Sequence, residues 1–355
     1  MRNMSTTRRG FMATGIGLAA ALASEEGASG AGQPQPAGPA ASQADLILKT
    51  IPRTGERIPA IGLGTFITFD LLPGDRRDHL AEVVRRYWEA GGRVFDTSPL
   101  YGMGEVNLGA FVAALGIGEQ MFLTNKIWST GDYLGDESHA ARSLAQSMER
   151  LWRSHLDVMQ CHSLVNVDVV VPLMRAWKKE GRVRYVAVTH HETPYFAILA
   201  DWVESGNVDF VQVHYSIHTR DAEQRVLKAA ADHGVGVLVN MPLEKARLHK
   251  LVEGRRLPGF AREIGIETWS QFFLKWVIAH PAVTCALQAT SNPDHLAENI
   301  GALRGPLPDP DMRTRMVRHM ESIPGFDQLA RIPWYPGKRY AGVINRALAA
   351  TRART

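Results

Sequence analysis

Short apolar segments recur along the chain, and the stretches between them space their apolar residues three and four apart, as amphipathic helices do. This helical spacing is clearest in the stretches 138–153 and 221–233. Each apolar segment has the length of a buried strand rather than of a helix. The segments lie at residues 60–64, 94–97, 121–127, 156–162, 183–189, 210–216, 235–241 and 283–290. The pattern therefore predicts eight β/α units.

Eight such units over roughly 300 residues are typical of an α/β protein with the (β/α)₈ TIM-barrel fold. Continuous apolar strands also suit a parallel sheet that is buried on both faces. The stretch LILKTIPRTGERIPAIGLGT, residues 46–65, predicts a short N-terminal β-hairpin that caps the barrel. The alternative is a doubly wound sheet, which usually carries GxGxxG after its first strand. Here GLGTFI lacks the third glycine, so the barrel is favoured.

Composition changes this picture little. The chain has 355 residues, of which 45% are hydrophobic and 21% charged, which is typical of a globular protein rather than a disordered one. The net charge of +4 is spread along the chain without a dense basic run, so we expect no nucleic-acid partner. Its 2 cysteines, Cys161 and Cys285, are far apart, which argues against a disulfide scaffold and a zinc ribbon.

Residues 1–23 have the composition of a targeting peptide. The adjacent Arg8 and Arg9 precede a Gly- and Ala-rich apolar stretch, 11–23, which is shorter than the roughly 20 residues that span a bilayer. TTRRGFM resembles the twin-arginine signal of bacteria, which exports folded proteins, and ALA at its end resembles a cleavage site. The alternatives are an ordinary Sec signal or a basic start with no such role. We expect a periplasmic protein, the twin-arginine export machinery as a partner, and no stable membrane insertion after processing.

The rest of the chain divides into three parts. Residues 24–45, rich in Gly, Ala, Ser, Pro and Gln, predict a flexible linker. Residues 46–305 are expected to form the barrel domain. Residues 306–355 are expected to form a C-terminal extension with a helix and a tail that contributes to the substrate loops.

Chemistry in a TIM barrel lies at the C-terminal ends of its strands. Near the predicted strand ends lie Asp96, Tyr101, Lys126 and His162. A lysine near the Tyr101 phenol would favour the phenolate and lower its pKa from about 10. An aspartate would keep that lysine charged, and a histidine would hydrogen-bond the substrate oxygen. Such a set can protonate a carbonyl oxygen while the carbon receives a hydride.

These residues also carry a family resemblance. The segment GGRVFDTSPLYGMGEVNLGAFV at 91–112, together with FLTNKIW and DVMQCHS, resembles the aldo/keto reductases, whose pattern is Gly-x-Arg-x-x-Asp-Thr-x-x-x-Tyr-Gly followed by Glu-x-x-Leu-Gly. The likeness runs from about residue 46 to residue 303. It implies NAD(P)H-dependent reduction of an aldehyde or ketone to an alcohol, with a small carbonyl compound as substrate. It also implies a catalytic tetrad of Asp96, Tyr101, Lys126 and His162, with Tyr101 as the proton donor.

The resemblance extends to a cofactor site, for which it implies NADP(H) rather than NAD(H). TSNPDHLAENI at 290–300 resembles the family's phosphate- and adenine-binding segment, at the start of a helix suited to anions. Gln212 matches the position that contacts the nicotinamide amide. The residues expected to bind the cofactor are Thr189, His190, Gln212, Asn240, Pro242, Leu243, Thr290, Ser291, Asn292, His295, Glu298 and Asn299.

Several of these positions depart from the family pattern. Thr189-His190 replaces the usual Ser-Asn pair, and Asn240 stands where many members stack a tyrosine on the nicotinamide. PLEKARL lacks the glycines of the common PLGRG loop. His295 replaces an arginine that binds the 2′-phosphate, and Ala289 replaces the lysine of some members. Because an imidazole loses its charge near neutral pH, we expect a weaker preference for NADPH than is usual.

Two other classes of function remain open. Strand-end histidines with Asp96 opposite resemble the metal centres of barrel hydrolases. The chain has no HxH or HExxH spacing, so we expect no metal, and polar pocket or surface positions are the alternative for these histidines. A barrel that only binds a ligand is the third possibility. The histidines of the metal hypothesis are His162, His190 and His214, and those with the polar pocket or surface alternative are His190, His191, His214 and His218.

Five apolar residues are candidates for the wall of a carbonyl-binding pocket, with core packing as the alternative for each. They are Phe66, Phe69, Leu100, Trp128 and Trp334.

Replacing both Arg8 and Arg9 by lysine should block export and leave unprocessed, folded protein in the cytoplasm, because the twin-arginine route requires the arginine pair. Cell fractionation measures this, and Arg2→Lys, outside the pair, is the matched control. Normal periplasmic delivery of the double variant would indicate a Sec route instead.

Overall fold

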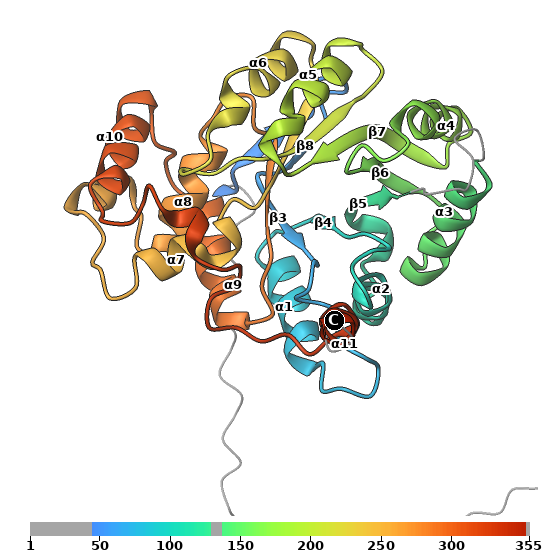
Figure 1. Ribbon diagram of the computed structural model, residues 1–355, viewed down its shortest axis with the longest axis horizontal. Helices are drawn as coiled ribbons and strands as arrows, with labels where there is room; N and C mark the ends of the chain where they lie inside the picture. Colours follow the sequence, from blue (N-terminus) through green and yellow to red (C-terminus); the bar gives the residue numbers. More distant parts are fainter. Residues whose placement is uncertain (1–44, 129–136, 353–355) are drawn as a thin grey trace, which may run out of the picture. The chain divides into compact units, whose positions relative to one another are not determined.

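A closed barrel of eight parallel strands forms the body of the protein (Figure 1). The computed structural model describes residues 45–128 and 137–352, so the predicted signal peptide (1–23) and linker (24–45, except for its last residue) lie outside the described residues. The strands follow the order β10-β3-β4-β5-β6-β7-β8-β9 around the barrel. They are β3 (Ile61–Gly64), β4 (Val94–Asp96), β5 (Phe122–Ile127), β6 (Leu156–His162), β7 (Val183–His190), β8 (Phe210–His214), β9 (Gly236–Asn240) and β10 (Cys285–Gln288). Each lies within or overlaps one predicted segment, so the predicted (β/α)₈ fold is confirmed.

The predicted hairpin is also present. Strands β1 (Leu48–Thr50) and β2 (Arg57–Pro59) pair antiparallel. Ile51 directly follows β1, and Ile58 lies in β2. Both are buried in the apolar cluster that fills the N-terminal end of the barrel. The barrel residues of that cluster are Val94, Phe122, Val158, Tyr185, Ala187, Phe210, Leu238, Cys285 and Leu287.

The barrel interior changes from apolar to polar along the strands. Alternate residues of a strand share one face, and along β5 these are Phe122, Thr124 and Lys126, all of them buried. The first belongs to the apolar cluster, whereas the other two bind the carboxylate of Asp96. The same order recurs in β8 with Phe210, Gln212 and His214. The polar layer of the barrel interior therefore lies at the C-terminal ends of the strands.

Helices cover the outside of the barrel. In α3, the residues Ala140, Leu144, Ser147 and Leu151 are buried at helical spacing, which explains why the stretch 138–153 is amphipathic. The predicted helix 221–233 is divided into a 3₁₀ turn and α6. No helix of the described residues is long and apolar enough to cross a bilayer. The helices are α1 (Asp78–Glu89), α2 (Gly104–Ala114), α3 (Ser138–Leu151), α4 (Val167–Lys179), α5 (Phe196–Glu204), α6 (Val226–Asp232), α7 (Arg247–Leu251), α8 (Trp269–Ile278), α9 (Pro293–Ile300), α10 (Pro310–Glu321) and α11 (Val343–Arg352).

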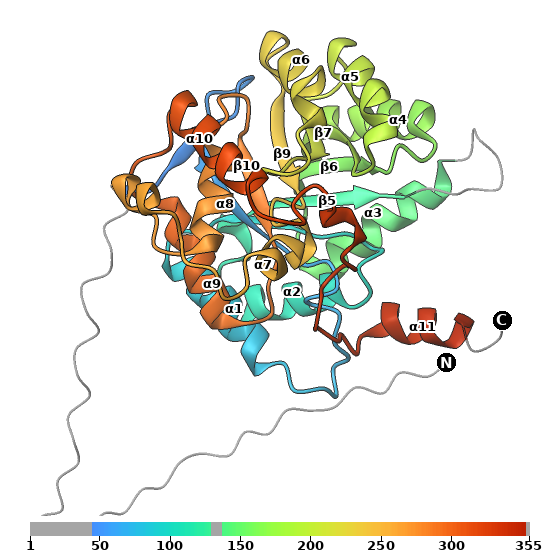
Figure 2. The same cartoon turned by 60° about the vertical axis from the view of Figure 1, so that its left-hand side comes forward.

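The C-terminal extension contains α10 and α11, joined by a long segment (Figure 2). We call residues 334–340 of that segment the C-terminal strap. The backbone N–H of Tyr335 donates to the carbonyl of Lys245 at 2.9 Å. Beyond the strap, the N–H of Ile344 donates to Oδ2 of Asp70 at 2.8 Å. The strap is therefore held at both ends against loops at the C-terminal side of the barrel.

The loop after β9 has an unusual backbone. Met241, Glu244, Lys245 and Ala246 have φ angles of 53°, 51°, 49° and 68°. The left-handed region costs a residue other than glycine roughly 1–2 kcal/mol. The last three of these residues lie in the PLEKARL segment, which lacks the glycines of the PLGRG pattern, so another interaction must hold the loop in this conformation.

A buried carboxylate holds it. Glu244 is fully buried, and its Oε1 accepts from Ser216 Oγ at 2.6 Å, from His214 Nε2 at 2.7 Å and from Thr219 Oγ1 at 2.8 Å. Its Oε2 pairs with the guanidinium of Arg247. Burial by itself raises the pKa of Glu244, but the hydrogen bonds, that of His214 foremost, outweigh burial and lower it to about 2. The loop is thus fixed to the end of β8 by an ionised side chain.

Glu244→Ala should lower the free energy of unfolding by about 3–5 kcal/mol, because it leaves buried Arg247 without its partner. Urea denaturation measures this. The matched control is Glu253→Ala, which breaks the exposed pair with Lys250 and should cost less than about 1 kcal/mol.

The difference in the free energy of unfolding between wild type and Glu244→Ala should depend on pH. The pKa of Glu244 is about 2 in the folded protein against an ordinary 4.5, so its stabilisation is complete above pH 4.5 and disappears as the pH falls toward 2. The gap between wild type and variant should shrink over that interval. A gap that stays constant would show that the carboxylate charge does not hold the loop.

Candidate active site

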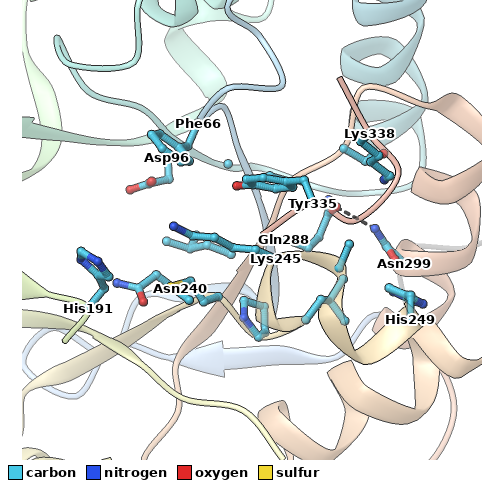
Figure 3. Close-up of a pocket in the computed structure, with 18 of the residues that line it drawn as sticks. Phe66, Asp96, His191, Asn240, Lys245, His249, Gln288, Asn299, Tyr335 and Lys338 are labelled. Carbon is cyan, nitrogen blue, oxygen red and sulfur yellow. Dashed lines mark hydrogen bonds between the residues drawn. The ribbon is translucent and has the colours of Figure 1, made fainter. Parts of the chain in front are cut away.

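One cavity of about 650 Å³ lies at the C-terminal end of the barrel (Figure 3). Its walls come from the ends of strands, from the loop after β9, from α9 and from the C-terminal strap. Of the predicted catalytic residues, Asp96, Tyr101 and His162 line it. Lys126 lies directly behind Asp96, so all four are in one place.

Asp96 and Lys126 form a buried ion pair. Lys126 Nζ lies 2.7 Å from both carboxylate oxygens and donates to the carbonyl of Thr97 at 2.9 Å. Asp96 Oδ1 also accepts from Thr124 Oγ1 at 2.5 Å and from Gln212 Nε2 at 2.9 Å. Burial lowers the pKa of Lys126, and Asp96 opposes that change. The lysine is fixed in position, with its charge directed at the aspartate.

Tyr101 lies next to this pair. Lys126 Nζ is 4.9 Å from the centre of its ring, and the ring of Phe66 meets it edge-on at 5.0 Å. Burial raises the pKa of Tyr101 well above its ordinary value of 10.0, and the charge of Asp96 raises it further. The expectation of a lowered pKa is therefore wrong, because burial of the phenol and the charge of Asp96 both raise the pKa. The phenol keeps its proton and is available as a donor.

His162 completes the group. Its Nδ1 lies 3.2 Å from Ser98 Oγ, and its ring is nearly perpendicular to that of Tyr101, with 6.0 Å between the ring centres. Burial and then the charge of Lys126 lower the pKa of His162 to about 3. The imidazole is therefore neutral near pH 7, with Nε2 free of the Ser98 contact. A neutral imidazole beside a protonated phenol can hydrogen-bond one substrate oxygen.

Ten of the twelve expected cofactor-binding residues line the cavity. Asn299 Nδ2 donates to Gln288 Oε1 at 2.8 Å on the side of the cavity where α9 lies (Figure 3). Two do not line it: Ser291, and Asn292, whose side chain caps α9 by accepting from the N–H of Asp294 at 2.8 Å. The lining residues are Thr189, His190, Gln212, Asn240, Pro242, Leu243, Thr290, His295, Glu298 and Asn299.

The strand-end histidines have separate partners. His162 contacts Ser98, His214 bonds Glu244, and His190 stacks on a tyrosine ring, that of Tyr195, at 3.8 Å. Within residues 45–128 and 137–352, no three His, Cys, Asp or Glu side chains are arranged to hold a metal ion.

Of the five apolar candidates for the wall of the pocket, only some line the cavity. Phe66 and Leu100 line the cavity. Phe69 does not: it is fully buried and packs against Phe111 in the core, with 6.3 Å between the ring centres. Trp128, 37% exposed, is also outside the cavity lining. Trp334 begins the C-terminal strap and covers the amino group of Lys245.

Some lining residues were not predicted. Lys245 comes from the loop after β9, and Tyr335, Lys338 and Tyr340 come from the C-terminal strap. The presence of a lysine in the PLEKARL segment was a signal for Lys245. Nothing local marks the others, because only the path of the chain beyond α10 brings them to the cavity.

The sequence matches the family model described as "Aldo/keto reductase family" over residues 60–316. It is 27% identical over 210 residues to an L-galactose dehydrogenase of Arabidopsis thaliana, covering 55% of this chain and 65% of that protein. It is 24% identical over 297 residues to an NADP-dependent D-sorbitol-6-phosphate dehydrogenase of Malus domestica, covering 73% of this chain and 90% of that protein.

Solved structures have the same fold. One is an aldo/keto reductase from Klebsiella pneumoniae in complex with NADP and acetate, with a TM-score of 0.63, 22% identity, and coverage of 83% of this chain and 98% of that one. Another is an aldo-keto reductase from Bacillus halodurans in its holo form, with a TM-score of 0.63 and 18% identity. The match covers 77% of this chain and 96% of that one. With the family model matching most of its length, this chain belongs to the aldo/keto reductase family.

Proposed function

We propose that this protein reduces an aldehyde or ketone to an alcohol with NAD(P)H, with Tyr101 as the proton donor. The observation that carries the proposal is the convergence of Tyr101, His162 and the Asp96–Lys126 pair at one end of a single cavity. Residues matching the family's adenine-binding segment line the same cavity.

The cavity fits a dinucleotide in its chemistry. In the described part of the chain, two buried polar atoms of lining residues have no hydrogen-bond partner: Asn240 Oδ1 and Gln288 Nε2. Leaving such atoms unpaired costs about 1–3 kcal/mol each, so a polar ligand that reaches them is favoured. Asn240, Thr189 and His190 would hold the nicotinamide end, whereas Glu298 and Asn299 would hold the adenine.

Each catalytic side chain then has a defined role. The cofactor, when bound, supplies the hydride that reaches the carbonyl carbon. Neutral His162 donates a hydrogen bond to the carbonyl oxygen, and Tyr101 transfers its proton to that oxygen. Lys126, above the Tyr101 ring, stabilises the phenolate that remains, and Asp96 keeps the lysine in place.

NADP(H) is the cofactor we propose. The Klebsiella structure with the same fold holds NADP, and the Malus relative is named NADP-dependent. An Escherichia coli relative, 24% identical, is named an NADH-specific methylglyoxal reductase, so the choice depends on residues of this chain. His295, which lines the cavity from the first turn of α9, is the proposed contact to the 2′-phosphate.

Tyr101→Phe should lower kcat by about 10²–10⁴-fold, the usual contribution of a general acid, without changing the Kd of NADPH. Aldehyde-dependent loss of NADPH absorbance measures turnover, and quenching of protein fluorescence measures Kd. Tyr340→Phe is the matched control, since it also removes a phenol that lines the cavity. Full turnover in the Tyr101 variant would exclude it as the proton donor.

His295→Ala should raise the Kd of NADPH about ten- to hundredfold, the cost of one charge-assisted hydrogen bond to a phosphate. The Kd of NADH, which has no 2′-phosphate, should not change. Titrating both cofactors at about pH 6, where a histidine can carry charge, measures the ratio. Equal changes for both cofactors would show that His295 supports the fold of α9 rather than binding the phosphate.

A further inference from the structure

Lys245 brings an amino group to the catalytic end of the cavity. Its Nζ lies 3.1 Å from the centre of the Trp334 ring and 5.1 Å from that of Phe66. Phe66 in turn contacts the ring of Tyr101. Figure 3 shows Lys245 extending from its loop toward the side where His191 and Asp96 lie, away from His249 and Asn299. The amino group is thus separated from the proton donor by one aromatic ring.

The described residues offer this amino group aromatic faces but no carboxylate. None of the salt bridges within residues 45–128 and 137–352 includes Lys245, and the neighbouring Glu244 is directed at His214 and Arg247. A half-buried ammonium without an anion is unfavourable, and burial lowers the pKa of Lys245 to about 7. The acidic residues that line the cavity have other partners: Lys126 for Asp96, Lys250 for Glu253 and Ser270 for Glu298.

The position of Lys245 is also fixed. Its φ of 49° lies in the left-handed region, between two residues of the same kind. The buried cluster around Glu244 holds the residue before it, and the N–H of Tyr335 binds its carbonyl oxygen at 2.9 Å. Backbone strain of this kind persists only where the surroundings enforce it, and it is found mostly at functional sites.

We propose that Lys245 binds an anionic group of the substrate, so that the natural substrate is an aldehyde or ketone that carries a carboxylate or a phosphate. The anion would lie between Lys245 and His191, which line the same cavity, while the carbonyl group meets Tyr101 and His162. Burial, together with the charge of Lys245, lowers the pKa of His191 to about 4, so its ring is neutral and can donate a second hydrogen bond to the anion. This inference rests on the proposed carbonyl reduction and names its substrate class.

The direct test compares two substrates that share the aldehyde and the ring and of which only the first is charged, 4-formylbenzoate and its methyl ester. Lys245→Met should lower kcat/KM for the acid about ten- to hundredfold and leave that for the ester unchanged, because only the acid loses a charge-assisted contact. Lys245→Arg should retain most of the preference. Lys228→Met, an exposed lysine paired with Asp232, is the matched control. A second pair, glyceraldehyde 3-phosphate and glyceraldehyde, distinguishes a phosphate from a carboxylate as the group bound.

A binding measurement separates this inference from the proposed function. Calorimetric titration of 4-(hydroxymethyl)benzoate into the protein with NADP⁺ should show binding that Lys245→Met weakens about ten- to hundredfold. Such binding without turnover of any aldehyde would contradict the proposed function and support the anion site. Equal losses for acid and ester, or a raised Kd for NADPH and NADH alike, would overturn the anion site, because Lys245 would then serve the loop or the dinucleotide.

Discussion

The ion pair between Asp96 and Lys126 constrains the whole C-terminal end of the barrel. The two side chains come from adjacent strands, β4 and β5, and are 7% and 1% exposed. Removing one buried charge would leave the other uncompensated, at a cost of about 3–5 kcal/mol. Thr124 and Gln212 complete the hydrogen bonding of the aspartate, so the polar layer inside the barrel is organised around one carboxylate.

That pair also affects the protonation of the two neighbouring rings, Tyr101 and His162. Burial and then the charge of Asp96 raise the pKa of Tyr101, so the phenol retains its proton near pH 7. His162 is neutral near pH 7, so it adds no positive charge beside the phenol of Tyr101. The site therefore places a protonated phenol beside a neutral imidazole. A second buried carboxylate, Glu244, acts on the backbone instead, because it holds a glycine-free loop that presents Lys245 to the same cavity.

The fold could be predicted because its signal is local. Strand β9, Gly236–Asn240, is buried along nearly its whole length, and it is a continuous apolar segment that ends in a polar residue. The tetrad could be predicted because its four residues stand at fixed positions in the motifs near three strand ends. The direction in which the pKa of Tyr101 shifts could not be predicted, since it depends on how deeply the phenol is buried and on its closeness to Asp96. Nor could the contact of Trp334 with Lys245, which joins distant segments, or the burial of Phe69, which depends on the packing of α2.

The central claim is that a hydride reaches the carbonyl carbon in this cavity while the protein supplies the proton. A single-turnover reaction with NADPH that carries deuterium at one face of C4 tests it most directly, with mass analysis of the product. The account predicts an alcohol with one deuterium on the former carbonyl carbon, from one of the two labelled faces only. An alcohol without deuterium from either label, or no alcohol from any aldehyde tested, would contradict it.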